Sequence, residues 1–335
     1  MLVPWAVVVA LPLAAAALQC MDNLVTFGDS YTDEGRFNYF FKHLRPPPVG
    51  EMLPPSNDTR SGGASWGRIV ANATGARYYN YAVIGAMCTN KTDARYVSAI
   101  NAPYPSVLEY EIETFEKDIS YEKLYPDRRS DNTVYALWIG TNDLGIPGFL
   151  TDTQRKGTTL TNFVDCVWET FDRVYKAGGR WFVLLNEMPL EHAPLYTTPY
   201  TGSGNYKYYE DKSAYNVTEY TNKVREYTTS ANTMLDYGVP FQLKLRDRWP
   251  GASFSIFDVH ALVDDVLASP TEYLGDHANV IAPYRICLDK CEDNTGDRRD
   301  FMWFDELHPT ERMHELFAHH FTDVVHGRSK YGTYW

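Results

Sequence analysis

The sequence has no basic residue near its N-terminus and, beyond that end, no long apolar run. Residues 1–19 contain no charged side chain, residues 7–11 are apolar and residues 14–17 are alanines, which is typical of a secretory signal peptide. No other stretch approaches the roughly 20 apolar residues that a membrane-spanning helix needs. We predict that residues 1–19 are a signal peptide, with an N-terminal anchor as the alternative. The mature protein is then expected to be secreted, extracellular and not stably inserted in a membrane.

Basic residues are scarce in the whole chain. Its 335 residues include 31 Lys and Arg against 43 Asp and Glu, which gives a net charge of −12. Nucleic-acid binding rests largely on clustered Lys and Arg that displace counterions, so this balance argues against a nucleic-acid partner. With 44% hydrophobic and 22% charged residues, the composition is that of a folded globular protein.

Internal repeats and low-complexity linkers are also absent. The proline run at residues 46–48 is too short to separate domains, and α/β proteins often form one unit of this size. We therefore predict a single domain over residues 20–335, and we expect a monomer.

Cysteine is sparse, with five residues at positions 20, 88, 166, 287 and 291. Cys287 and Cys291 could close a small loop, which leaves one of the other three unpaired. Because zinc sites need Cys or His pairs at short spacings, a disulfide is the better interpretation of this pair. N-x-[ST] sequons, which predict N-glycosylation of a secreted protein, occur at Asn57, Asn72, Asn90 and Asn216.

Strand and helix patterns alternate along the chain. Apolar, β-branched or aromatic runs predict buried strands at residues 24–27, 78–82, 134–139, 181–185 and 254–257. Helical periodicity occupies about 64–74, 106–118, 158–177, 216–236 and 310–325. This order predicts a mainly parallel five-stranded sheet with helices on both faces, in which ligands bind outside the carboxyl ends of the strands.

The first predicted strand leads directly into Gly28-Asp29-Ser30. Glycine permits a sharp turn there, and a serine can project at the end of the strand. A serine hydroxyl is a weak nucleophile and needs an imidazole within hydrogen-bonding reach, which in turn needs a group that holds its tautomer. Ser30 is therefore the candidate nucleophile, and the chain has to supply a histidine.

Near the other end of the chain, Asp305 and His308 share one short loop before a predicted helix. A three-residue spacing can bring the Asp305 carboxylate to Nδ1 of His308 while Nε2 faces Ser30. An Asp-x-x-His pair alone is common in surface turns, so the prediction depends on the other motifs.

Two further residues follow predicted strands at the same edge of the sheet. Asn142, after the third strand, offers an amide that could donate to a developing oxyanion, and such a donor is worth on the order of 10²–10³ in rate. Gly85, after the second strand, could add its backbone N–H beside that of Ser30. Taken singly, both are ordinary turn residues.

Together these four blocks resemble the SGNH (GDSL-type) hydrolases, named for Ser, Gly, Asn and His in this order, matched here by Ser30, Gly85, Asn142 and His308. The resemblance spans nearly the whole mature chain. Within the family, Gly28-Asp29-Ser30-Tyr31-Thr32-Asp33, Asn80-Tyr81-Ala82 and Gly85-Ala86-Met87-Cys88 look most like fungal carbohydrate esterases that remove acetyl groups. The run Ser61-Gly62-Gly63-Ala64-Ser65-Trp66 follows the family's Asn-Gly-x-x-Trp only loosely.

The resemblance implies a three-layer α/β/α sandwich of the flavodoxin-like type, with no metal and no organic cofactor. It implies a Ser30–His308–Asp305 triad, an oxyanion hole formed by Ser30, Gly85 and Asn142, and a covalent acyl-enzyme. The expected substrate is a small-molecule or oligosaccharide ester, most simply an acetylated oligosaccharide derived from hemicellulose.

Two alternative functions remain open. One is a GDSL-type lipase that acts on longer acyl esters, and the other is an inactive carbohydrate-binding protein. Residues 190–215 carry six tyrosines among Gly, Ser, Thr and Pro, which suits a sugar cleft or an ordinary surface loop equally.

Other hydrolase classes fit the sequence less well. We expect no serine of the chain to stand in the Gly-x-Ser-x-Gly nucleophile elbow of α/β-hydrolases. The zincin pattern needs two histidines four apart, whereas His314 and His319 are five apart, so we expect these residues, with His320 and Glu315, to lie on a partly exposed helix face. No carboxylate pair stands out as that of a glycoside hydrolase.

Overall fold

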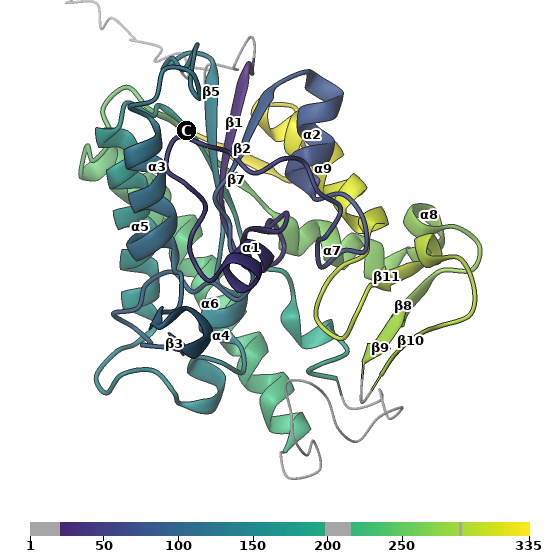
Figure 1. Ribbon diagram of the computed structural model, residues 1–335. Coiled ribbons are helices and arrows are strands. Elements are labelled where there is room, and N and C mark those ends of the chain that lie inside the picture. The colour runs from purple at the N-terminus through teal and green to yellow at the C-terminus, as the bar shows by residue number, and fades with distance from the viewer. Residues whose placement is uncertain (1–20, 198–215, 288–289) are drawn as a thin grey trace, which may run out of the picture.

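The computed structural model describes residues 21–197, 216–287 and 290–335 (Figure 1). The predicted signal peptide, Cys20 and the tyrosines between residues 198 and 215 lie outside these ranges. Within them, Tyr196 of the tyrosine-rich segment is a core residue, only 1% exposed.

A twisted central sheet contains the five predicted strands and one more. Its strands are β1 (Asn23–Gly28), β2 (Arg77–Asn80), β5 (Thr133–Trp138), β6 (Trp181–Leu185), β7 (Ser253–Phe257) and β12 (Gly332–Tyr334). They are ordered β12-β7-β6-β5-β1-β2, and all neighbours are parallel except β12, which is antiparallel to β7. The predicted mainly parallel sheet is confirmed, but its strand number was wrong: β12 is too short and too polar to give an apolar run.

The strands are buried on both faces because successive side chains point to opposite sides. Leu24 and Ala136 belong to one core cluster, with Trp66 and Phe317, and Val25 belongs to the other. Figure 1 shows the consequence, with α3 and α5 on one side of the sheet and α2 and α9 on the other.

The five predicted periodic segments correspond to α2, α3, α5, α6 and α9, whereas α1, α4, α7 and α8 were missed. The helices are α1 (Arg36–His43), α2 (Trp66–Thr74), α3 (Glu113–Asp118), α4 (Thr141–Leu144), α5 (Leu160–Lys176), α6 (Val217–Pro240), α7 (Val259–Ala268), α8 (Pro270–Leu274) and α9 (Glu311–Val325). A π-helical turn, η2 (Val107–Ile112), leads into α3. None of the helices in the described ranges combines the length and apolarity that a membrane crossing requires.

Three small strand pairs lie outside the central sheet. They are β3 (Tyr96–Val97) with β4 (Ala102–Pro103), β9 (Arg285–Cys287) with β10 (Cys291–Asp293), and β8 (Asn279–Pro283) with β11 (Phe301–Trp303). The segment from β8 to β11 projects beside the sheet in Figure 1 and leads into the loop that carries Asp305 and His308.

The register of the sheet determines where the site forms. Gly28 at the end of β1 is paired with Trp138 at the end of β5. Ser30 and Asn142 follow these two positions closely, so parallel pairing brings them to one edge of the sheet.

Candidate active site

The turn that carries Ser30 depends on a glycine before it. Gly28 has φ +146°, and a Cβ at this position would lie 2.1 Å from the carbonyl oxygen of Trp138. The backbone N–H groups of Thr32 and Asp33 then donate to the carbonyl of Asp29, which closes a tight turn around Ser30. Ser30 is 5% exposed at the tip of this turn.

The loop between β11 and α9 holds the histidine. The N–H groups of Leu307 and His308 both donate to Asp305 Oδ1, at 3.0 and 2.9 Å. His308 Nδ1 lies 2.7 Å from the same oxygen and 2.9 Å from Oδ2. Its Nε2 lies 2.8 Å from Ser30 Oγ, so the structure brings together the three residues that the sequence predicted as a triad.

Asp305 is half-buried, and its charged form is favoured. Burial by itself raises the pKa of this carboxyl, but the His308 ring and the two backbone N–H donors outweigh that effect and bring the pKa below its ordinary value. A carboxylate held in this way fixes the proton of His308 on Nδ1 and leaves Nε2 free to accept one.

Asn142, at the start of α4, lies between two segments of the site. Its Nδ2 donates to the carbonyl of Ala86 at 3.0 Å and to Asp29 Oδ2 at 3.3 Å. The amide therefore links the turn that carries Ser30 to the loop that carries Gly85.

Gly85 adopts φ +76° in that loop, a conformation that favours glycine. Its position is fixed by neighbours, since the N–H of Ile84 donates to Asp33 Oδ2 at 2.8 Å and the Arg95 guanidinium donates to Gly85 O. No described residue accepts a hydrogen bond from the N–H of Gly85 or from that of Ser30. Both groups are therefore free to bind an oxygen of a ligand.

Comparison with known proteins identifies the family of the chain. The family model for GDSL-like lipases and acylhydrolases matches residues 24–321. The chain belongs to this family.

Two relatives of this GDSL hydrolase are acetylesterases. An acetylesterase of Hypocrea jecorina is 46% identical over 318 residues, covering 93% of this chain and 91% of the relative. An acetylesterase of Thermothelomyces thermophilus is 27% identical over 316 residues, covering 91% and 88%. The solved structure of an acetylxylan esterase from Geobacillus stearothermophilus, 13% identical, matches with a TM-score of 0.39 over 92% of this chain and 96% of its own. The family and the first relative make the protein a carboxylic ester hydrolase.

The buried carboxylates around the turn that carries Ser30 were not identified as site residues from the sequence. Two of them, Asp29 and Asp33, belong to the motif of residues 28–33. Asp33 accepts the N–H groups of Gly35, Arg36 and Phe37 besides that of Ile84. Asp143 accepts the N–H of Cys88 at 3.0 Å. These carboxylates bind backbone donors and hold the loops of the site in place.

Burial disfavours the charged form of these groups. It raises the pKa of Asp29 to about 7, because desolvation outweighs the Tyr31 N–H bond, and that of Asp143 also to about 7, despite the Cys88 N–H bond. Glu111, on η2, is fully buried with its pKa well above the ordinary value, and its Oε2 accepts the N–H of Gly28 at 2.9 Å.

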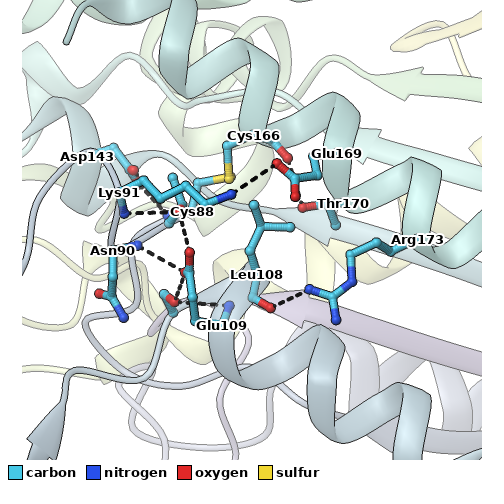
Figure 2. The surroundings of a disulfide bond; sticks show 12 residues. Cys88, Asn90, Lys91, Leu108, Glu109, Asp143, Cys166, Glu169, Thr170 and Arg173 are labelled. Atoms are coloured by element: carbon cyan, nitrogen blue, oxygen red, sulfur yellow. Dashed lines mark hydrogen bonds and ion pairs between the residues drawn. A yellow bond between two sulfur atoms is a disulfide. The ribbon is translucent and has the colours of Figure 1, made fainter. Parts of the chain in front are cut away.

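Two disulfide bonds cross-link the described parts of the GDSL hydrolase. Cys287 is bonded to Cys291 across the β9–β10 hairpin, as the sequence suggested, and Cys88 is bonded to Cys166. Figure 2 shows that the second bond joins the loop after β2 to α5, directly beside Asp143. Disulfides are typical of proteins that fold in an oxidising compartment.

The predicted glycosylation sites differ in exposure. Asn57, Asn72 and Asn216 are exposed, whereas Asn90 is half-buried and its Nδ2 donates to Tyr104 O at 2.9 Å. Glycosylation of all four stays a prediction.

The histidines of α9 are not equivalent, and the expectation of a shared exposed face was wrong for one of them. His314 is 2% exposed, and its Nδ1 accepts the N–H of Trp66 at 3.0 Å. Burial lowers its pKa to about 3, so this ring is neutral. His319 and His320, with Asp323, have ligand atoms within 4.8 Å of one another and could hold a metal ion near the surface.

One motif was overlooked in the sequence. Gly63-Ala64-Ser65-Trp66-Gly67 has the spacing of a nucleophile elbow. Ser65, however, is the N-cap of α2: its Oγ accepts the N–H of Arg68 at 3.2 Å and donates to Glu34 at 3.0 Å. This serine is a helix cap without a histidine partner among the described residues.

Proposed function

We propose that this GDSL hydrolase is a secreted esterase that removes acetyl groups from carbohydrates through a Ser30–His308–Asp305 triad. The hydrogen-bond chain from Ser30 Oγ through His308 to Asp305 supports the mechanism. The 46% identity to an acetylesterase supports the acetyl group as the acyl part of the substrate.

In the first step, Ser30 Oγ attacks the ester carbonyl carbon and its proton moves to His308 Nε2. The new C–O bond gives a tetrahedral intermediate with negative charge on the former carbonyl oxygen. When the C–O bond to the alcohol breaks, the imidazolium protonates the leaving oxygen, and an acetyl-Ser30 ester remains.

In the second step, water attacks the acetyl-enzyme while His308 accepts its proton. The tetrahedral intermediate collapses with release of acetate, and the proton returns to Ser30 Oγ. Because a protonated imidazole cannot accept a proton, activity falls on acidification.

The oxyanion of both intermediates is bound by the N–H groups of Ser30 and Gly85 and by the Asn142 amide. The two backbone donors have no described acceptor, so they need no rearrangement. The Asn142 contact with Asp29 is long, at 3.3 Å, and this N–H is the one that turns to the substrate oxygen.

Secretion is supported by the two disulfides and by the sequons on exposed residues. The carbohydrate part of the substrate has less support. A lipase that prefers longer acyl chains and an inactive carbohydrate-binding protein are the alternatives that an experiment has to separate.

The test is acetate release from acetylated xylo-oligosaccharides by the purified protein and by Ser30→Ala. A matched control is Ser120→Ala, which removes an exposed hydroxyl that bonds only to the carbonyl of Lys117. We expect acetate from the wild type and the control, and none above background from Ser30→Ala. Full activity of a folded Ser30→Ala protein would exclude the proposed nucleophile, and an inactive wild type would favour the binding protein.

Chain-length preference is measured on acetyl and octanoyl esters of one alcohol. If the protein is an acetylesterase, the acetyl ester is hydrolysed faster than the octanoyl ester. A strong preference for octanoate would instead establish the lipase.

A further inference from the structure

A tyrosine outside the SGNH blocks contacts the loop that carries Gly85. Tyr104, just after β4, donates its hydroxyl to the carbonyl oxygen of Ile84 at 2.7 Å. That carbonyl and the N–H of Gly85 belong to the same peptide group. The hydroxyl is therefore bonded to one end of the peptide whose other end is the proposed oxyanion donor.

The Tyr104 ring is held on several sides. Its backbone N–H donates to Arg95 O at 2.8 Å, and its backbone carbonyl accepts Asn90 Nδ2 at 2.9 Å. The Arg95 guanidinium lies 4.3 Å from the ring centroid, and the Phe37 ring stacks on it at 6.1 Å. The hydroxyl is thus directed at Ile84 by the packing of its own segment.

The contact is also close on the Gly85 side. A Cβ on Gly85 would lie 2.4 Å from Tyr104 Oη, so the hydroxyl occupies the space beside this glycine. Arg95 donates to the next carbonyl, that of Gly85 itself. The carbonyls of Ile84 and Gly85 therefore both accept hydrogen bonds from side chains of residues 95–104. The N–H of Gly85 has no acceptor among the described residues.

The Tyr104 hydroxyl is the donor in its bond to Ile84 O. Burial raises its pKa to about 12, even though Arg95 opposes the rise. A carbonyl oxygen can only accept, so the direction of the bond is fixed.

We propose that Tyr104 is a positioning residue for the oxyanion hole, acting through the Ile84–Gly85 peptide. Its bond to Ile84 O fixes the orientation of the peptide plane and polarises it, which makes the Gly85 N–H a better donor to the developing negative charge. This inference rests on the proposed function, because the peptide matters for catalysis only if Ser30 attacks an ester beside it.

The expected effect is smaller than loss of a donor. Removing one oxyanion donor costs on the order of 10²–10³ in rate, whereas a neighbouring hydrogen bond strengthens the next one by about 10–30%. We expect Tyr104→Phe to lower kcat by about two- to eightfold. KM is expected to change by less than about twofold, because the Gly85 N–H is used mainly in the transition state.

A merely structural role gives a different pattern. Tyr104 also lines an apolar cavity of about 460 Å³ between α1 and the segment around residues 100–110. If the ring served only as a wall of a substrate pocket, its hydroxyl would be dispensable, and substitutions would change KM or chain-length preference.

The experiment compares Tyr104→Phe with Tyr96→Phe, which removes a tyrosine hydroxyl from the same hairpin. Tyr96 is 59% exposed, and its hydroxyl bonds to Asn101 rather than to the site. The readouts are kcat and KM on an acetyl ester, the inhibition constant of methylboronic acid, and the thermal midpoint. A boronic acid adds to the serine and presents an oxygen to the oxyanion hole, so it reports on the hole without turnover.

We expect Tyr104→Phe alone to lose kcat, and to bind methylboronic acid more weakly by a similar factor. An unchanged kcat, or a change confined to KM, would overturn the proposal. Ser30→Ala separates the two hypotheses: an active Ser30→Ala removes the proposed function itself, whereas an inactive one together with a fully active Tyr104→Phe removes only this inference.

A second variant guards against a packing effect. Phe37→Leu removes the stacked ring but leaves the Tyr104 hydroxyl in place, so we expect kcat within about twofold of the wild type. If it lost as much kcat as Tyr104→Phe, packing rather than the hydrogen bond would be responsible.

Discussion

The two halves of the site use buried carboxylates in opposite ways. On the sheet side, Asp29 and Asp143 accept backbone N–H groups, and burial raises the pKa of each to about 7. On the loop side, Asp305 also accepts backbone N–H groups, but its pKa lies below the ordinary value because the His308 ring is next to it.

The difference shows what makes a buried carboxylate suitable for catalysis. Backbone donors alone do not compensate for desolvation on the sheet side, and those groups serve to hold loops in place. A partner that can become a cation is needed to keep the charge. The Arg95 guanidinium near Asp143 does not compensate for the burial of that carboxyl. Asp305 alone of these three is hydrogen-bonded directly to a side chain that can become a cation, the candidate base His308.

The substitution expected to have the largest effect on activity is Asp305→Asn. An amide cannot hold the His308 proton on Nδ1 in the same way, so Nε2 no longer accepts from Ser30 reliably. We expect kcat to fall on the order of 10³–10⁴ with the fold retained. Steady-state kinetics and circular dichroism measure this, and a folded Asp305→Asn protein with more than a tenth of normal kcat would contradict the triad.

The covalent links of the two halves also differ. Cys88–Cys166 closes a separation of 78 residues beside Asp143, and Cys287–Cys291 closes only 4. In the chain-entropy account, replacing the first pair by alanine lowers the free energy of unfolding by about 4 kcal/mol, and replacing the second by about 2 kcal/mol. Denaturant midpoints of the two double variants test the order, and equal losses would count against it.

Asn142→Ala tests the donor that joins the sheet side to the substrate. Loss of its amide is expected to lower kcat on the order of 10² with little change in KM. The same change also leaves Asp29 Oδ2 without its described partner. If KM rose while kcat stayed constant, Asn142 would bind substrate rather than the oxyanion.

The last prediction concerns how the free energy of unfolding depends on pH. The pKa of Asp29 rises from an ordinary 3.8 to about 7 on folding. Between these values the unfolded chain releases its proton while the folded one retains it, so stability falls as pH rises through this window.

Asp29→Asn should therefore lose less stability than the wild type between pH 4 and pH 7. Asp305 has the opposite sign: its stabilisation is present above its unfolded pKa and is lost as pH falls through its lower folded pKa. Unfolding midpoints of Asp29→Asn between pH 4 and pH 7, and of Asp305→Asn as the pH falls below about 4, sharpen the comparison. Profiles parallel to that of the wild type in both windows would refute it.

Much of the fold could be predicted from the sequence because its strands are buried on both faces. Runs such as residues 134–139 are continuous and apolar, and they identify the parallel strands directly. Strand β12 could not be predicted because its three residues, Gly, Thr and Tyr, form no apolar run, and its position depends on pairing with β7. Short helices such as α1 escaped because tertiary packing, rather than a long periodic pattern, holds them.

The residues of the site could be predicted, but not their supports. Ser30, Asn142 and His308 stand in spaced motifs, and the structure brings Ser30 and His308 into contact. Glu111 has no motif, and its contact with Gly28 depends on the π-helical turn η2. Tyr104 likewise meets Ile84 only through the fold of the β3–β4 segment.

The hydrogen bond between Ser30 and His308 joins residues 278 positions apart. Loop closure over such a distance is slow compared with local contacts, and it requires the C-terminal part of the chain to be present. During synthesis the serine is made long before the imidazole, so no nascent chain short of residue 308 has its base. Ester cleavage is therefore expected to appear only when the segments that carry Ser30 and His308 have met, and its onset during refolding should report this long-range contact rather than the first collapse.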